Sequence, residues 1–231
     1  MGAKLYGTEH LIYITSSLLI TFLIIFLSKK FLKNEKQQTL LIKIVAIILF
    51  ITILTNRIVL VFEYDKPDWT KFLTDTFCST SSYVLSLSIL LGKKDNIVLH
   101  FAWLISLVGG SIVTFYVDFI EQNPSFLYPS TILGVLHHTI SAILVILILI
   151  FKYIHITYKK SYVVLIGFSG YLLHGLFMRY VFNYVNPFFM YEPAIPNTPL
   201  TVWVIAPIYI VGYICIILAI ELTRKFRKKP R

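Results

Sequence analysis

The sequence predicts an all-α polytopic membrane protein with seven transmembrane helices, its N-terminus outside and its C-terminus in the cytoplasm. The first observation is composition. Hydrophobic residues make up 57% of the 231 residues and charged residues 14%, whereas soluble domains carry roughly 25% charged residues. The second is a series of seven apolar runs, each close to the ~20 residues that span a bilayer. The third is the distribution of basic residues, which alternates between successive connections.

The apolar runs define the expected helices in chain order. The first ends at Ser28, before Lys29 and Lys30, without the small-residue cleavage site of a signal peptide, so we expect it to remain as a membrane helix. The third is the weakest by hydropathy. We place the spans at residues 10–28, 40–62, 72–91, 96–119, 130–151, 161–183 and 200–222. They form a single domain, residues 1–222, followed by a basic cytoplasmic tail, residues 223–231.

Basic residues in the connections set the orientation. The N-terminal tail and the second, fourth and sixth connections hold only Lys4, Lys66 and Lys71. The remaining connections and the C-terminal tail hold fifteen Lys or Arg residues, and the positive-inside rule assigns these to the cytoplasm. Removing any one span would disrupt this alternation. The net charge of +10 is therefore mainly a topology signal, so we expect a multi-pass protein of the cell membrane with no nucleic-acid partner.

The third run carries an unusual polar stretch. Residues 74–82 contain seven hydroxyl or acidic side chains in nine positions, and they surround Cys78. Polar and ionisable groups inside a bilayer cost free energy and usually face a bundle interior, where they mark functional sites. The stretch therefore predicts a polar chamber among the helices.

Depth strengthens this prediction. At 1.5 Å per residue, Cys78 lies roughly 10 Å below the start of its span, and His137 and His138 reach a similar depth in the fifth span. Further polar residues fall in the same outer half of the bilayer or at its edge: His10, Asn56, Arg57, Asp75, Asp118, His174 and Arg179. We expect the chamber to open toward the outer leaflet.

Each of these residues also has a structural interpretation. A lone cysteine often packs as a small hydrophobic residue, and hydroxyl clusters commonly join membrane helices by hydrogen bonds. Arg57 and Asp75 could form a buried ion pair. Because adjacent residues point ~100° apart on a helix, only one of His137 and His138 needs to face the chamber. The sequence leaves open which one does.

Taken together, the residues suggest acyl chemistry. A thiol reacts as its thiolate, and a histidine within hydrogen-bond reach activates it while a third group orients the histidine. Cys78 would be the nucleophile, His137 or His138 the base, and Asp75 or His174 the orienting group. The predicted substrate-binding residues are Asn56, Arg57, His174, Arg179 and His10. The two arginines are suited to binding a phosphate.

Short motifs along most of the chain resemble one family. Five short segments are similar to motifs of bacterial YwaF-type integral membrane proteins. They are Tyr6-Gly7-Thr8-Glu9-His10, Asn56-Arg57, Phe77-Cys78, Leu136-His137 and Ala206-Pro207-Ile208-Tyr209. These proteins distantly resemble the transmembrane protein 164 acyltransferases and the androgen-induced transmembrane hydrolases. The resemblance implies a seven-helix fold and a Cys-His or Thr-His lipid acyl site, with Cys78 as nucleophile and His137 as base, or His138 in the alternative alignment.

Two other functional classes remain open. A transporter or binding subunit would use the chamber to capture a small molecule or a lipid headgroup, and an accessory protein would have no chemistry there. An enzyme needs the Cys78 thiol. A binding protein tolerates Cys78→Ser but no longer binds its ligand when Arg57 or Arg179 is replaced. We expect membrane lipids as partners, a small-molecule ligand in the binding alternative, and no cofactor or metal site.

Overall fold

The computed structural model describes residues 5–63, 65–116, 125–195 and 197–228, and within them all regular structure is helical. The helices are α1 (Thr8–Phe31), α2 (Glu35–Val61), α3 (Phe77–Leu91), α4 (Ile97–Phe115), α5 (Pro129–Ile150), α6 (Val163–Phe182) and α7 (Val202–Lys228), with 3-10 turns η1 (Trp69–Phe72), η3 (Tyr158–Lys160) and η4 (Pro187–Phe189). The predicted all-α fold with seven helices is confirmed. Six are long and apolar enough to cross a membrane, whereas α3 has 15 residues.

The third helix begins at Phe77, later than the expected Phe72, because the polar stretch caps the helix instead of extending it. Thr76 has an extended backbone, and its hydroxyl accepts a hydrogen bond from the Ser79 N–H at 3.4 Å. Hydroxyl and carboxylate side chains favour such cap positions over helix interiors. Asp75 therefore lies in the connection before α3 rather than within the helix.

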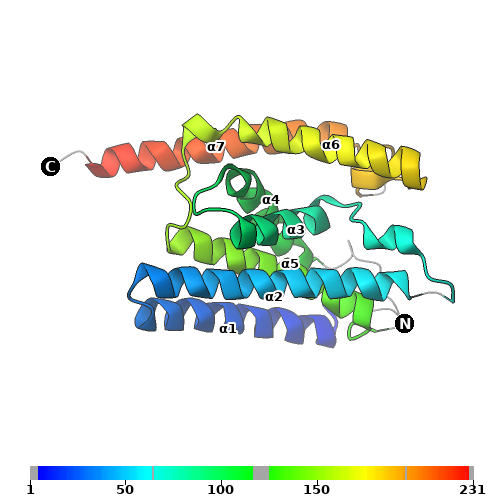
Figure 1. Ribbon diagram of the computed structural model, residues 1–231, viewed down its shortest axis with the longest axis horizontal. Coiled ribbons are helices and arrows are strands. Elements are labelled where there is room, and N and C mark those ends of the chain that lie inside the picture. The colour runs from blue at the N-terminus through cyan, green and yellow to red at the C-terminus, as the bar shows by residue number, and fades with distance from the viewer. Residues whose placement is uncertain (1–4, 64, 117–124, 196, 229–231) are drawn as a thin grey trace.

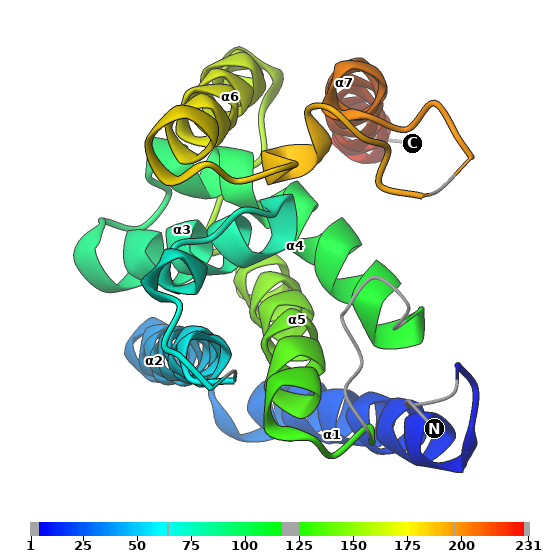
Figure 2. The same cartoon turned by 90° about the vertical axis from the view of Figure 1, so that its right-hand side faces the viewer.

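The helices form a bundle built around α5 (Figures 1 and 2). α5 packs against α2 and α4, while α3 packs against α2 and α4 beside it. α1 contacts α5 on one side of the bundle, and α6 and α7 lie side by side on the opposite side. α1 begins at one end of the bundle, and the last turns of α7 lie toward the opposite end.

Burial differs strongly between the helices. In the most apolar part of α5, 67% of the residues are buried, compared with 11% in α1 and in α7. The fully buried residues Leu49, Leu85, Leu99 and Leu144 come from the four central helices and form the core. The apolar outer faces of α1 and α7 are thus left for lipid, as expected for peripheral helices of a membrane bundle.

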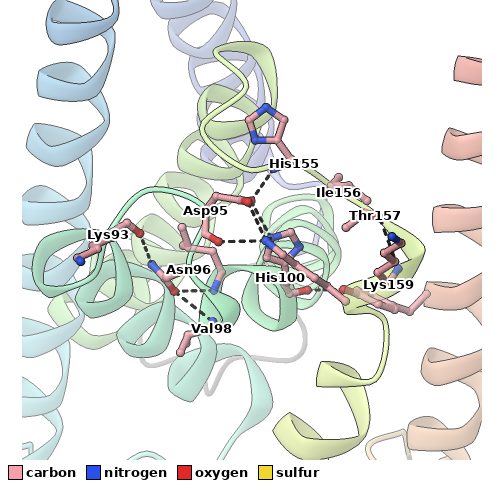
Figure 3. A network of polar contacts seen from close by, with 12 residues as sticks. Lys93, Asp95, Asn96, Val98, His100, His155, Ile156, Thr157 and Lys159 are labelled. Atoms are coloured by element: carbon pink, nitrogen blue, oxygen red, sulfur yellow. Dashed lines mark hydrogen bonds and ion pairs between the residues drawn. The ribbon is translucent and has the colours of Figure 1, made fainter.

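Asp95 lies in the connection between α3 and α4 and bonds to two other parts of the chain (Figure 3). These are α4, through His100, and the connection between α5 and α6, through His155 and Lys160. The Asp95 carboxylate accepts hydrogen bonds from the His155 N–H at 2.7 Å and from Lys160 Nζ at 2.7 Å, and lies 2.8 Å from His100 Nε2. Burial by itself raises the pKa of Asp95, but these hydrogen bonds outweigh burial and lower the pKa to about 2. The network therefore requires an ionised carboxylate.

We expect Asp95→Asn to destabilise the protein by about 2 kcal/mol at pH 7, from the difference between the ordinary pKa of 3.8 and the folded value of about 2. Because the folded pKa is the lower one, this stabilisation is present above pH ~4 and is lost as the pH falls toward ~2. Thermal unfolding of the detergent-solubilised protein at a series of pH values checks this. The difference between wild type and variant should shrink as the pH falls.

The matched control is Glu35→Gln. Glu35 pairs with Lys94 at 2.6 Å, but its side chain is 72% exposed, and such surface pairs contribute little to stability. Equal losses from the two substitutions, or a pH-independent effect of Asp95→Asn, would contradict the role of the Asp95 network.

Candidate functional site

Cys78 is the second residue of α3, two positions after the cap residue Thr76. The first-turn N–H groups of a helix have no acceptor within the helix and carry partial positive charge, which favours an anionic group beside them. Space for the thiol comes from Gly109 on α4, since a Cβ built there would lie 2.6 Å from Cys78 Sγ. The sulfur thus sits at a helix N-terminus, against a glycine of the neighbouring helix.

The thiol opens into an apolar cavity of about 360 Å³. Side chains of α3, α4, α5, α6 and α7 line it, together with residues of the connection between α6 and α7. Its polar lining residues are Thr76, Cys78, His138 and Tyr209. The cavity is therefore mainly apolar, with polar side chains at only a few points.

A second, polar cavity of about 250 Å³ adjoins the first and shares the wall residues Thr76, His138 and Phe189. Arg57 and Lys71 supply its cationic groups, and Asp75 supplies its carboxylate. With two cations and one anion, the cavity is net positive when its histidines are neutral. It therefore suits an anionic group.

Phe189 is placed in the shared wall by an unusual backbone. Phe188 and Phe189 in η4 have φ values of 53° and 57°, a left-handed region that aromatic residues rarely adopt. The Phe188 N–H donates to the Asp75 carbonyl at 2.7 Å, which ties this turn to the segment before α3. Strained backbone of this kind gathers at ligand-binding sites.

Arg57 is held in the polar cavity with part of its guanidinium unpaired. The residue is 7% exposed, and Nη2 donates to Ser79 Oγ at 2.7 Å. The predicted pair with Asp75 is present but long, at 3.9 Å between Nη1 and Oδ1. Nε is buried without a partner among the described residues. A buried guanidinium with spare donors is a strong binder of carboxylate or phosphate.

The two adjacent histidines divide between the cavities. His138 lines both, whereas His137 lines only the polar one. Their rings lie 4.1 Å apart at 81°. Both ring nitrogens of His137 are buried and unpartnered within the described structure. His138 is therefore the histidine that shares a cavity with Cys78. No hydrogen bond joins His138 to Cys78 among the described residues. Such bonds often form only when substrate is bound.

Other predicted site residues are engaged elsewhere. His10 Nδ1 accepts from the Tyr6 N–H at 3.1 Å, and its Nε2 lies 3.1 Å from the Thr114 carbonyl oxygen. His174 Nε2 lies 2.8 Å from the Thr74 carbonyl oxygen, and Arg179 donates to the Tyr184 carbonyl at 3.0 Å. None of these three predicted residues lines either cavity.

Two further predicted residues belong to the polar cavity. Asn56 lines it and donates to the Ser130 carbonyl at 3.1 Å. Asp75 faces Arg57, and no hydrogen bond joins it to either histidine in the part of the chain described. Asp118 lies outside the described residues. Within those residues, no three His, Cys, Asp or Glu side chains come together as metal ligands do.

Comparison with known proteins places the chain in a family. The model of the TMEM164 family matches residues 5–223, which is almost the whole chain. The chain belongs to the TMEM164 family. This confirms the predicted distant relation to transmembrane protein 164, while the YwaF-type likeness stays a prediction. No curated protein and no solved structure matches the chain. Its helices and its family together identify this TMEM164-family chain as a multi-pass membrane protein.

Sequence reasoning missed several residues of the site in this TMEM164-family protein. Lys71 was counted only as a connection charge, yet it lines the polar cavity. Tyr209 lines the thiol cavity, but an aromatic residue in an apolar helix gives no polar signal. The packing of Gly109 against the thiol becomes evident only from the structure.

Proposed function

We propose that this protein is a membrane lipid acyltransferase or esterase in which Cys78 is the nucleophile and His138 the general base. The observation that carries the proposal is the shared apolar cavity of Cys78 and His138, which continues past His138 into a cationic polar cavity. An acyl lipid has the same organisation, with a hydrocarbon chain joined through an ester to a polar headgroup.

The proposed binding mode follows from the chemistry of the two cavities. The acyl chain occupies the apolar cavity, and an anionic headgroup such as a phosphate pairs with Arg57 and Lys71. The ester then lies at the shared wall, beside His138 and near the thiol. With the orientation expected from the basic connections, both cavities belong to the outer half of the cell membrane.

The proposed reaction has two halves. His138 takes the thiol proton, and the thiolate of Cys78 forms a C–S bond to the ester carbonyl carbon. The ester C–O bond breaks, and the leaving alcohol takes the proton from His138, which leaves a thioester on Cys78. Water or the hydroxyl of a second lipid, deprotonated by His138, then forms a C–O bond to the thioester carbonyl carbon. The C–S bond breaks, the fatty acid or the acylated lipid leaves, and the sulfur takes the proton back from His138.

The test is labelling of the purified protein in lipid with an alkyl iodoacetamide at a series of pH values. Cys215 is exposed, so wild type and Cys78→Ser are both compared in a Cys215→Ser background. We expect labelling at Cys78 near neutral pH, absent from Cys78→Ser, and competition by phospholipid. A thiol that reacts only at high pH, as unactivated thiols do, would contradict the proposal.

A binding or transport site is the second candidate. It is favoured by Arg57 Nε and the two ring nitrogens of His137, which have no partner among the described residues and belong to side chains that line the polar cavity. If Cys78 is unreactive while phospholipid still binds, and binding is retained in Cys78→Ser but lost in Arg57→Met, capture of a headgroup replaces catalysis as the function.

A further inference from the structure

Tyr209 on α7 lines the thiol cavity, and its phenol hydroxyl has no partner among the residues that the structure describes. Its ring packs against Phe168 with centroids 5.2 Å apart and against Tyr213 at 6.3 Å. Its hydroxyl is buried and makes no hydrogen bond within the described structure. The ring is thus well held by its neighbours while the hydroxyl remains unused.

The neighbouring phenols are different. Tyr171 shares a hydrogen bond of 2.6 Å with Ser81 Oγ, and the Tyr213 hydroxyl donates to the His100 carbonyl. A buried polar group without a partner costs roughly 1–3 kcal/mol, so such groups are uncommon in folded proteins and call for an explanation. In a mainly apolar cavity, the missing partner of Tyr209 is most simply an oxygen atom brought by the ligand.

We propose that Tyr209 donates a hydrogen bond to the carbonyl oxygen of the bound acyl group and stabilises the oxyanion that forms on it. The inference rests on the proposed function. When the Cys78 thiolate forms the C–S bond, the carbonyl π electrons move onto oxygen, and the negative charge develops in a cavity that excludes water. When the C–O bond to the leaving alcohol breaks, those electrons return and the thioester carbonyl is restored.

The place of Cys78 on its helix supplies a second donor to the same oxygen. The Cys78 N–H belongs to the first turn of α3, where N–H groups have no acceptor within the helix. A backbone N–H and a side-chain donor aimed at one developing charge form a common type of oxyanion site. Tyr209 is thereby a catalytic residue, since its hydroxyl contacts the reacting oxygen.

Two reactions at the same thiol test this role. Acylation of Cys78 by p-nitrophenyl octanoate passes through an oxyanion, and its rate is measured from the burst of nitrophenolate that it releases. Alkylation by an alkyl iodoacetamide has no oxyanion. We expect Tyr209→Phe to slow acylation by about 100- to 1000-fold while the alkylation rate stays at the wild-type value. All proteins carry Cys215→Ser, which leaves Cys78 as the reactive thiol.

Stability and a matched variant separate this role from a structural one. Because the Tyr209 hydroxyl has no partner among the described residues, Tyr209→Phe should leave the unfolding temperature equal to or above that of wild type. Tyr213→Phe, one turn further along α7, removes a partnered hydroxyl and should lower the unfolding temperature while leaving the acylation burst intact.

The outcomes are distinguishable. If wild type forms the thioester and Tyr209→Phe forms it equally fast, the role of Tyr209 is overturned and the proposed function stands. If Tyr209→Phe slows both reactions alike, the phenol acts on packing around the thiol, and the inference is again overturned. If wild type is alkylated but never acylated, the proposed function fails together with the inference.

Discussion

Replacing His138 by glutamine is expected to slow the alkylation and acylation of Cys78 by about 10²- to 10⁴-fold, the usual contribution of a general base. The reason is geometric, because His138 is the histidine that lines the thiol cavity. Glutamine keeps a similar size and a hydrogen-bonding amide but takes up no proton near neutral pH. The measurement is the pH dependence of both rates, where the rise near neutral pH should disappear in the variant.

His137→Gln provides the comparison within the same helix. His137 lines the polar cavity and not the thiol cavity, so we expect a clearly smaller effect on alkylation and a weaker competition by phospholipid. If His137→Gln loses more of the alkylation rate than His138→Gln does, then His137 is the general base and His138 belongs to headgroup binding. This result would also mean that α5 is rotated in the working protein relative to the structure described here.

Replacing Gly109 by alanine is expected to displace the thiol and slow its acylation by about 10²-fold, the effect of a misplacement near 1 Å. The added Cβ would lie 2.6 Å from Cys78 Sγ, so the sulfur must leave its present position. Because the sulfur ends a short side chain, the helices have little need to move. The burst of nitrophenolate measures acylation, and the unfolding temperature tests whether the fold is retained.

The control for helix propensity is Gly170→Ala in α6. No heavy atom lies within 4 Å of a Cβ built at Gly170, so this change should stabilise the protein by up to about 1 kcal/mol and leave acylation unchanged. If Gly109→Ala acylates as fast as Gly170→Ala, the thiol has a second productive position and its contact with Gly109 is unimportant.

The helical fold was predictable because long apolar runs have few alternatives in a bilayer. The residue at which α3 begins was harder to predict. Hydropathy counts Thr74 and Thr76 as slightly polar helix residues, whereas the chain uses the Thr76 hydroxyl to cap the helix. The predicted span therefore included Asp75, which the structure places in the preceding connection.

The site was predictable in part. Depth along the helices placed Cys78 and His138 in one layer, and the structure brings them into one cavity. Which of the two adjacent histidines faces the thiol depends on the rotation of α5, which is set by packing against α2 and α4 and is not encoded in spacing. Depth alone also grouped His10 with the site, although its ring is engaged with the backbone of Tyr6 and Thr114.

α7 forms part of the wall of the thiol cavity, and this position predicts how the proposed lipid substrate would arrive. That wall includes Ile205 and Tyr209 of α7, a helix with only 11% of its span buried. A lipid would then enter sideways from the surrounding bilayer, without first dissolving in water. Turnover would follow the mole fraction of substrate in the membrane rather than its bulk concentration. Adding inert lipid at constant total substrate should therefore slow the reaction by surface dilution.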